Sequence, residues 1–569
     1  MKMRHEISGK VRTQVFLLLL SAAVPLLFAG CSDDWNDHYD ASTADNGTLW
    51  QALKNDKSLA NFVSVAEACG YDVVLGGSQN YTVFVPTDNY FTTAEADSLI
   101  AEFRKQQAAN VHSDDNTVVR QFLQNHIALY KQPISSLTND TITLLNDKYA
   151  VLTATHLGNR ELIGKNDLYN NGLLFTIDGK LDYMPNVFEY LGHDRDLDSV
   201  YQFLKRYNVY EFNDAKSVPG EIIDGMTHYL DSVSDLHNAL LEQLGLINSE
   251  DSTYWLVCPT NEQWDSLLTV YTPYFNYPRD VAKRDSLIYV QSRLAIIGGA
   301  FFSRTLNPDV AFSDSAVSTL APSAQARQLL DADYPYYTYY KPFEPGGVFY
   351  GTDDIACSNG HVLKAAKYNI SKFDTFLQTT RVEAEDIQSQ DSIIDAVSPL
   401  LVREVLSNNA FYGQVSKNSF AEVVPSTATA QVQVSFKLPN LLSNVKYDIY
   451  GVFAPATAYD TLATEESLRP NIVNTTLYWR DQNGKETKRP FGNKTVTTTK
   501  VDTLLLVSNF AVPTCSYGTS EAQVKLLVKS NLSDKQLATH SGTLRIDCFI
   551  VKPHEQKATR RARRTSTNH

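Results

Sequence analysis

The chain has few cysteines, no excess of basic residues and none of the common hydrolase motifs. Its six cysteines among 569 residues show no CxxC spacing, so neither a zinc site nor a disulfide framework can be read from them. The net charge of −14 argues against a nucleic-acid partner, because phosphate binding requires a basic face. The twelve histidines are scattered, and neither HExxH nor GxSxG occurs. We therefore predict that the protein is not an enzyme and does not bind nucleic acid.

Residues 1–30 have the pattern of a signal peptide. The basic segment MKMRHEISGKVR precedes the apolar run TQVFLLLLSAAVPLLFAG, and Cys31 follows directly. The residues from Leu27 to Gly30 resemble a bacterial lipobox, in which a peptidase cuts before a lipid-bearing cysteine, although Phe28 departs from the usual aliphatic residue. The alternatives are an ordinary secretory signal with a chance cysteine, or a membrane anchor, for which the apolar run is barely long enough.

Residues 31–46 are expected to form the lipidated cysteine and a polar tether. The acidic cluster Ser32-Asp33-Asp34 resembles the signal that sends lipoproteins of the Bacteroidetes to the outer face of the outer membrane. This resemblance implies a surface-exposed protein anchored in the cell outer membrane through Cys31. Several acyl chains on one cysteine satisfy the requirement for stable anchoring.

A strand followed by a helix is indicated at 81–91, where the sequence reads YTVFVPTDNYF. The β-branched and aromatic residues favour a half-buried strand, and Pro86 ends it because proline has no N–H to donate. Thr87 or Asp88 is then expected to cap the helix that runs through AEADSLIAEFRKQ. The Thr-Asp pair is therefore interpreted as a structural joint.

The same pattern occurs a second time along the chain. TYWLVCPTNEQW at 253–264 has a strand-like run ended by a proline, and Gln263 follows Thr260 at the spacing of a capping box. An Asn-Gly turn feeds a β run in both halves, in NNGLLFTIDGKLDY (170–183) and in SNGHVLKAAKYNI (358–370). Two motifs in the same order predict two copies of one domain.

These motifs resemble those of the fasciclin (FAS1) domain family. The matching segments are Tyr81 to Asp88 for the TVFAPT-like motif, Asn171 to Leu174 for the Asn-Gly motif, and Asn125, His126 and Ile127 for the NHI-like motif. The resemblance covers 47–185 well and 196–375 more loosely, and it implies two compact α+β domains. It also implies an adhesion role, for which His126 is the candidate residue. Alternatively, His126 is a histidine satisfied inside the core.

Residues 376–555 have the sequence pattern of an all-β domain. Runs such as KYDIYGVFAP and DTLLLVSNFAV, separated by Asn, Gly and Ser, predict a β-sandwich of the jelly-roll type. The segment 386–409 interrupts this pattern with helix-like spacing, and 556–569 is expected to be a basic, disordered tail. The opening VEAED and the closing LRIDCFIV resemble carbohydrate-binding modules of family six. The expected fold class is thus α+β, with two tandem fasciclin-like domains before the sandwich.

Three carboxylates of this last domain form a candidate metal site. Glu383 and Glu385 alternate on one strand face and could join Asp547 as oxygen ligands of a structural Ca²⁺. The resemblance to the carbohydrate-binding family implies such a site on the first and last strands. The alternative is a solvated strand edge with unconnected charges.

An aromatic-rich stretch, DADYPYYTYYKPFEPGGVFYG at 331–351, is the candidate ligand-binding segment. Rings on a loop rich in Pro and Gly suit sugar rings or protein partners. Alternatively, they close an insertion against the core of the second fasciclin-like domain. The candidate residues are Tyr334, Tyr336, Tyr337, Tyr339, Tyr340 and Phe343.

The sequence therefore predicts a non-enzymatic surface lipoprotein that acts in adhesion or ligand binding, with an extracellular glycan or a surface protein as its partner. Modules in a row permit avidity, so weak contacts can add up. The alternative is an accessory glycan-binding protein of a polysaccharide-uptake system, which would use the C-terminal sandwich. No cofactor is expected beyond the structural calcium.

Overall fold

The computed structural model describes most of the chain between Asn46 and His554. The stretches outside this description are 1–45, 112–114, 165–166, 215–216, 224, 232, 304–314, 318–337, 522 and 555–569. The proposed lipid site Cys31 and three of the candidate binding tyrosines, Tyr334, Tyr336 and Tyr337, therefore lie outside the described residues.

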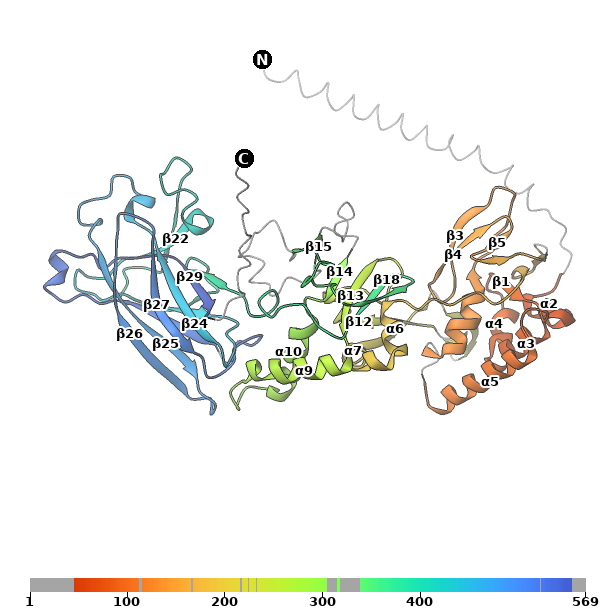
Figure 1. Ribbon diagram of the computed structural model, residues 1–569. Helices are drawn as coiled ribbons and strands as arrows, with labels where there is room; N and C mark the ends of the chain where they lie inside the picture. The colour runs from red at the N-terminus through yellow and green to blue at the C-terminus, as the bar shows by residue number, and fades with distance from the viewer. Residues whose placement is uncertain are drawn as a thin grey trace, which may run out of the picture. The chain divides into compact units, whose positions relative to one another are not determined.

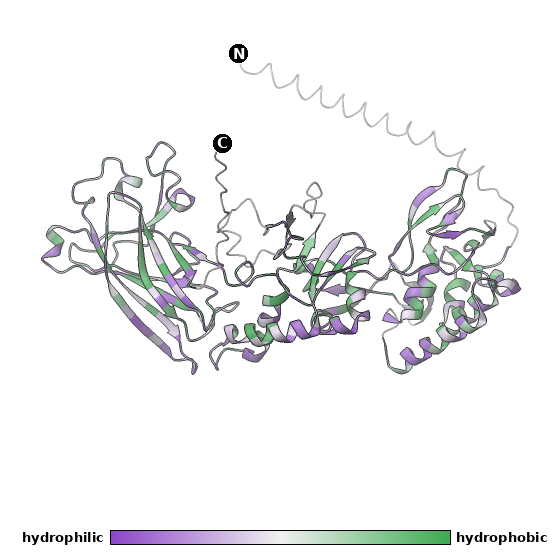
Figure 2. Cartoon of the chain, in the orientation of Figure 1, coloured by the Kyte–Doolittle hydropathy of each residue, from purple (hydrophilic) through white to green (hydrophobic). Residues whose placement is uncertain are grey.

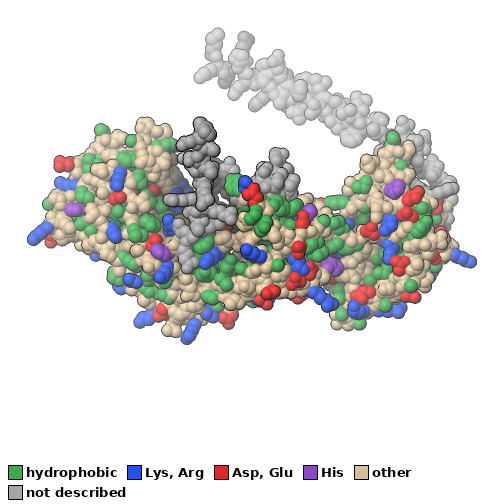
Figure 3. Space-filling model, in the orientation of Figure 1, with side chains coloured by type: hydrophobic (Ala, Val, Ile, Leu, Met, Phe, Trp, Pro, Cys, Tyr) green, Lys and Arg blue, Asp and Glu red, His purple; other side chains and the backbone are tan. Residues whose placement is uncertain are grey.

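The described chain forms two compact units. One contains the residues up to Tyr183 together with Phe212–Ser234, and the other contains Met184–Glu211 together with the residues from Asp235 onward. Charged side chains of both signs are spread over the visible surface (Figure 3). Between Asn46 and His554, no described helix is both long and apolar enough to span a bilayer.

The first unit is built on a four-stranded sheet with the spatial order β2-β1-β8-β7 (Figure 1). Its strands are β1 (Tyr81–Pro86), β2 (Ile127–Leu129), β7 (Asp167–Tyr169) and β8 (Gly172–Ile177). The helices are α2 (Leu49–Asn55), η1 (Lys57–Leu59), α3 (Ala60–Ala68), α4 (Tyr71–Gly76), α5 (Thr93–Ala108), η3 (Val119–Leu123) and η4 (Gln124–His126). A second sheet contains β3 (Asn139–Thr143), β4 (Tyr149–Thr153), β5 (His156–Leu157) and β6 (Arg160–Glu161). The hairpin β10 (Val218–Ile223) and β11 (Met226–Asp231) completes the unit, and β11 contacts α4.

Strand β1 lies between two hydrophobic layers. Val83 and Val85 belong to the core formed with the helices, whereas Phe84 points to the second sheet and stacks on Phe175 with ring centroids 5.4 Å apart. Successive side chains of a strand point to opposite faces, so an all-apolar strand suits a sheet that is covered on both sides. Hydrophobic residues follow the central strands in Figure 2.

The second repeat has a four-stranded sheet with the equivalent order, β14-β13-β18-β17. Its strands are β13 (Tyr254–Pro259), β14 (Phe301–Ser303), β17 (Asp353–Cys357) and β18 (Gly360–Ala365). The helices are α6 (Val187–His193), η5 (Arg195–Leu197), α7 (Asp198–Lys205), α8 (Leu241–Leu244), α9 (Asn261–Tyr271), η6 (Thr272–Phe275) and α10 (Arg284–Ile297). Four further strands are insertions: β9 (Asn208–Phe212), β12 (Ser234–Asn238), β15 (Ser315–Val317) and β16 (Thr338–Tyr340). The register also repeats, because Tyr81 pairs with Gly172 and Tyr254 pairs with Gly360, in parallel strands in both cases. The two repeats therefore share strand order and register, and the predicted mixture of helices and strands is confirmed.

The Asn-Gly turns explain why the motif occurs in both repeats. The side chain of Asn171 accepts the N–H of Leu49, at the start of α2, at 2.7 Å and donates to the carbonyls of Leu75 and Gly77. In the second repeat Asn359 makes the same contacts. It accepts the N–H of Val187, at the start of α6, at 2.9 Å and donates to Ile247 and Ser249. Each asparagine is 3% exposed and links the first helix, the loop before the central strand and the sheet.

The glycine of each pair is required by its neighbours. A Cβ at Gly172 would overlap the carbonyl oxygen of Tyr81, and a Cβ at Gly360 would overlap that of Tyr254. Gly360 also has φ of 143°, a conformation that L side chains rarely adopt. The close parallel approach of the two central strands therefore excludes any side chain at these positions.

The helix cap predicted at Thr87-Asp88 is wrong. Helix α5 begins after Thr92, which forms a capping box with Glu95, while the carboxylate of Asp88 accepts the N–H of Asn61 in α3 at 3.0 Å. Asp88 therefore connects two segments instead of starting a helix. In the second repeat Thr260 does cap α9, as predicted.

The C-terminal domain is a sandwich of two sheets. One has the order β21-β22-β29-β24-β27, with β19 beside β29, and the other has the order β20-β23-β28-β25-β26. The strands of the first sheet are β19 (Thr380–Glu383), β21 (Leu401–Glu404), β22 (Ser419–Val423), β24 (Lys446–Phe453), β27 (Asp502–Ala511) and β29 (Leu544–Pro553). Those of the second are β20 (Gln390–Ile394), β23 (Gln433–Leu438), β25 (Asn471–Arg480), β26 (Glu486–Val496) and β28 (Val524–Ser530). Short 3-10 turns occur at η7 (Ser416–Asn418), η8 (Ala456–Ala458) and η9 (Gln536–Ala538).

The helix-like spacing at 386–409 does not correspond to a helix. This segment forms β20 and β21, which are edge strands of the two sheets. Its apolar residues are largely exposed, with Ile387 at 75%, Ile394 at 51% and Val402 at 54%, so their spacing does not mark a buried helix face.

Within the second unit, the second repeat and the sandwich pack against each other. The hydroxyl of Tyr277 donates to the carbonyl of Tyr517 at 2.7 Å, and the N–H of Cys515 donates to Asn276 at 2.9 Å. Phe376, at the start of the sandwich, lies 4.9 Å from the ring of Tyr271. The two therefore share one continuous hydrophobic core.

Candidate functional site

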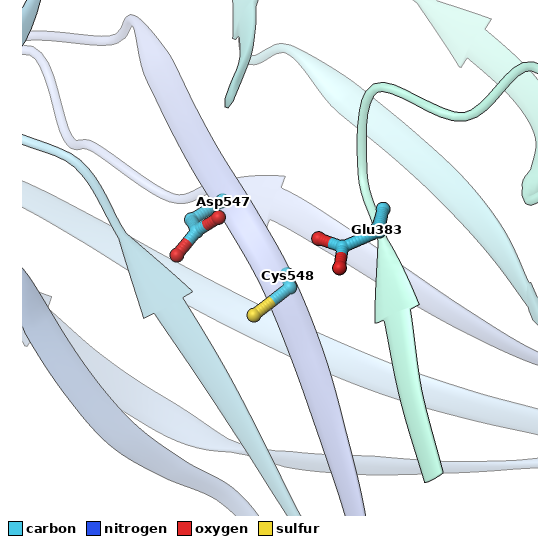
Figure 4. Close-up of side chains that lie close together, drawn as sticks. All are labelled: Glu383, Asp547 and Cys548. Atoms are coloured by element: carbon cyan, nitrogen blue, oxygen red, sulfur yellow. The ribbon is translucent and has the colours of Figure 1, made fainter. Parts of the chain in front are cut away.

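A cluster of acidic side chains lies where the first and last strands of the sandwich pair. Glu383 ends β19 and stands directly opposite Cys548 in β29. The ligand atoms of Glu383, Asp547 and Cys548 all lie within 4.8 Å of one another (Figure 4). We call these residues, together with Glu385, the carboxylate cluster.

An irregularity in β29 brings Asp547 into this cluster. On the neighbouring strand β24, Val452 pairs with Cys548 and Phe453 pairs with Ile546, so Asp547 has no opposite residue. The alternation of buried and partly exposed residues along β29 is interrupted at this point, because the consecutive residues Asp547 and Cys548 are both only 2% exposed. Such a bulge turns a side chain that would otherwise point to the opposite face.

Hydrogen bonds hold only part of the cluster. The N–H of Ser416 donates to Asp547 at 3.1 Å, and the hydroxyl of Ser416 donates to Oε1 of Glu383 at 2.7 Å. The hydroxyl of Ser419 donates to Oε1 of Glu385 at 2.6 Å. In the described chain, Oε2 of Glu383 and Oε2 of Glu385 are buried without a hydrogen-bond partner. Buried carboxylate oxygens without partners are unfavourable unless another group compensates them.

The electrostatics of the cluster favour a cation. The pKa of Asp547 is raised to about 7, mainly by burial. The Ser416 N–H lowers this pKa, and the neighbouring Glu383 and Glu385 raise it. Burial likewise raises the pKa of Glu385. When several carboxyl groups are buried close together, ionising all of them is energetically unfavourable unless a positive charge lies nearby.

The residues present fit Ca²⁺. Two oxygens bound to one calcium ion can be up to about 4.8 Å apart, given its usual bond lengths, and calcium prefers carboxylate oxygens. Burial raises the pKa of the Cys548 thiol well above its ordinary value, and the nearby carboxylates of Asp547 and Glu383 add to this effect. Cys548 is therefore suited to line the site as a neutral thiol and not to bind the metal as a thiolate. A calcium ion would supply positive charge to Glu383, Glu385 and Asp547.

The structure thus brings two of the predicted carboxylates, Glu383 and Asp547, within ligand distance of each other and adds Cys548. Glu385 lies near enough to raise the pKa of Asp547 but outside this group of ligand atoms. Cys548 was missed because strict strand alternation would place it on the opposite face from Asp547. The two consecutive buried positions in a strand are visible in the sequence only as the short run DCF, which does not reveal a bulge.

The candidate adhesion residue His126 is fully buried in the first unit. Its Nδ1 lies 2.7 Å from the carbonyl oxygen of Phe122, and its Nε2 accepts the N–H of Leu181 at 2.9 Å. The ring therefore carries its proton on Nδ1. Both nitrogens are engaged inside the domain, which agrees with the alternative that His126 is a core residue.

This environment gives a pH prediction for the first unit. Burial lowers the pKa of His126 from 6.5 to about 4, because the charged ring would lose its hydration, while the carbonyl of Phe122 acts in the opposite direction. Protonation of Nε2 would also break its hydrogen bond from the N–H of Leu181. The folded state then binds fewer protons than the unfolded state between these values. Its stability is fully present above pH 6.5 and should fall by up to about 1.4 kcal/mol per pH unit as the pH drops towards 4. Urea unfolding of wild type and His126→Gln at pH 7, 6 and 5 measures this, and equal pH slopes for the two proteins would contradict it.

The candidate aromatic segment is split between core and surface. Tyr339 is 7% exposed and packs on Phe302 with ring centroids 5.8 Å apart. Tyr340 is 78% exposed and Phe343 is 44% exposed, and the ring of Phe343 lies 6.1 Å from that of Trp255. Of the described residues, Tyr339 closes the domain and Tyr340 faces solvent.

Comparison with known proteins identifies the first repeat. Residues 57–182 match the family model of the fasciclin domain, so this part of the chain is a fasciclin domain. No curated protein shows a significant match. The family model does not extend to the second repeat, for which the shared strand order and the Asn359 contacts remain the support.

Several solved structures are distantly similar. One is a FAS1 domain pair from the insect cell adhesion molecule Fasciclin I, at 12% identity and a TM-score of 0.18, covering 56% of this chain and 98% of that chain. Another is the CBM22-1 xylan-binding domain from Paenibacillus barcinonensis Xyn10C, at 15% identity and a TM-score of 0.20, covering 32% of this chain and 96% of that chain. A further xylan-binding domain of CBM 22 has 12% identity and a TM-score of 0.19, with 31% and 95% coverage.

Proposed function

We propose that the protein is a non-enzymatic adhesion or binding protein of the bacterial cell surface, held at the outer membrane by lipid on Cys31. The observation that carries this proposal is the fasciclin domain at 57–182, since this family consists of adhesion and binding domains. The second repeat doubles the surface that such a protein presents, and two modules on one chain allow avidity.

The anchor and the exposure are tested together on intact cells. Wild type is expected to sediment with the outer membrane and to be cut by protease added to whole cells. Cys31→Ala should be released from the membrane almost completely, because the lipid supplies the attachment. Cys69→Ala is the matched control, since Cys69 is a half-buried thiol of the first unit and should leave the anchor unchanged. Wild type that resists protease on whole cells would contradict surface exposure.

The partner is sought by cross-linking on the same cells. A surface protein or glycan recovered with wild type, and lost with Cys31→Ala, is the expected result. Recovery of periplasmic proteins alone would overturn the surface role.

A second candidate function is glycan binding by the C-terminal sandwich. It is favoured by the two-sheet all-β fold and by the carboxylate cluster that joins its first and last strands. Deleting the sandwich would also damage the second repeat, because Tyr271 and Tyr277 would lose the core that they share with the sandwich. Point substitutions in the full chain are therefore the appropriate variants, with binding to a glycan array as the measurement.

A further inference from the structure

The outward face of the five-stranded sheet carries a row of basic residues. Lys437 in β23 pairs with Lys525 in β28, Lys525 pairs with Tyr478 in β25, and Tyr478 pairs with Lys488 in β26. Directly paired residues of neighbouring strands point to the same face, so these side chains form one continuous line. Lys529, two pairs along β28, lies on the same face. Basic side chains lie over β25 and β26 in Figure 3.

The positive charges of this face are only partly balanced. Like charges directly opposite each other are destabilising, yet Lys437 and Lys525 are cross-strand neighbours in a chain of net charge −14. Lys525 has a carboxylate partner, Asp391, at 2.9 Å, and the Lys488 ammonium lies 5.8 Å from the ring of Tyr478. Among the described residues no ion pair is formed by Lys437 or Lys529. A face that keeps such charges is suited to an anionic ligand.

A pocket at the end of this row adds further cations. It has a volume of about 160 Å³, and its lining includes Lys437, Arg381 and Lys417 as well as the amides of Gln388 and Gln523. Lys417 has φ of 50°, a conformation uncommon outside glycine. Two carboxylates, Glu383 and Asp386, also line the pocket, and Glu383 is held by Ser416 in the carboxylate cluster.

The side chains between the lysines are mostly hydroxyls and amides, with Leu527 among them. The next pairs along the sheet bring Ser435, Leu527 and Thr476 into line, and the pairs after these bring Gln433, Lys529 and Asn474. Such a surface offers hydrogen bonds as well as charge. Its few separated cations are too sparse for nucleic acid, which presents a phosphate at every nucleotide.

We propose that this face, from the pocket at Arg381 and Lys417 across Lys437, Lys525 and Lys488, binds an anionic polysaccharide that carries carboxylate or sulfate groups. The inference rests on the second candidate function and specifies its ligand class. The acidic groups would lie against the lysines, and the sugar hydroxyls against the amides and hydroxyls of the sheet.

The test compares the full chain with two double variants of equal charge change. Lys437→Glu with Lys525→Glu alters the proposed face, while Lys446→Glu with Lys552→Glu alters strands β24 and β29 of the other sheet. Binding is measured to polygalacturonate, to dextran sulfate and to neutral xylan, at low and high salt. We expect the first variant to lose at least about tenfold in affinity for the polyanions and the second to change by less than about twofold. Wild-type affinity should also fall with salt.

Additional variants and ligands separate a binding defect from a folding defect and identify the anionic group. Lys437→Gln with Lys525→Gln should weaken binding at unchanged melting temperature, so that a folding defect is separated from a binding defect. A preference for polygalacturonate or for dextran sulfate identifies carboxylate or sulfate as the ligand group. Equal losses in both double variants, equal affinity for duplex DNA, or absence of polyanion binding would each overturn the proposal. Binding of xylan alone would overturn it while leaving glycan binding intact.

Discussion

Alanine in place of Asn171 should lower the free energy of unfolding of the first unit by roughly 4 kcal/mol. The substitution leaves the N–H of Leu49 and the carbonyls of Leu75 and Gly77 without their partner in a place that is 3% exposed. Each buried group that loses its hydrogen bond contributes about 1 to 3 kcal/mol. Urea denaturation of the full chain measures the loss, and hydrogen exchange of peptides from the first repeat assigns the transition.

The chain offers two comparisons for this substitution. Asn170→Ala changes the exposed neighbour in the same turn and should shift stability by less than about 0.5 kcal/mol. Asn359→Ala removes the equivalent contacts of the second repeat and should reproduce the loss in the second unit. A change below about 1 kcal/mol for Asn171→Ala would show that the asparagine does not organise the fold.

The duplicated fold could be predicted because its signals are local. Pro86 ends a strand, and a two-residue turn precedes β8 and β18 in the two repeats. The turn residues are Asn170-Asn171 and Ser358-Asn359, one residue earlier than the predicted Asn-Gly turns, because each glycine already pairs as the first residue of its strand. These signals are legible in sequence, and their repetition in the same order strengthens each of them.

The cap of α5 was predicted at the wrong residue although its signal was present. Thr92 and Glu95 have the spacing of a capping box, but Thr87 and Asp88 stand closer to the proline and offer the same local chemistry. Which residue caps α5 depends on Asn61, which is 27 residues before Asp88 in the chain and whose backbone N–H donates a hydrogen bond to the Asp88 carboxylate. Local chemistry alone could not decide between the two candidates.

The candidate site was predictable in its carboxylates and not in its geometry. Glu383 and Glu385 stand two residues apart, and strand alternation predicted a common face for them. In the structure β19 ends at Glu383, so Glu385 lies beyond the strand and the predicted alternation on one strand is wrong. The position of Asp547 depends on the bulge in β29, and the packing of the sandwich on the second repeat depends on contacts such as Tyr277 to Tyr517. Both are long-range pairings that leave no periodic pattern in the sequence.

Calcium should stabilise the second unit, and the effect should depend on Glu383. A ligand present at about 1,000 times its Kd adds about 4 kcal/mol to the stability of the state that binds it. We expect added Ca²⁺ to raise the melting temperature of the full chain after chelator treatment, and Glu383→Gln to abolish most of this shift. Glu486→Gln is the control, since this exposed residue of β26 lies in the other sheet. A shift that survives Glu383→Gln would place the calcium elsewhere.

The pH dependence separates this site from an unspecific salt effect. Because the pKa of Asp547 is raised from 3.8 to about 7, the calcium-free folded state binds more protons than the unfolded state between these values. The stability that this proton contributes is fully present below pH 3.8 and is lost as the pH rises through 7. Calcium requires the ionised carboxylate, so its stabilising effect must grow over the same range. Between pH 5.5 and 8, the chelated wild-type protein should therefore lose stability relative to Asp547→Asn. Over the same range, the rise in melting temperature that calcium causes should become larger. A calcium effect that does not depend on pH would contradict binding at Asp547.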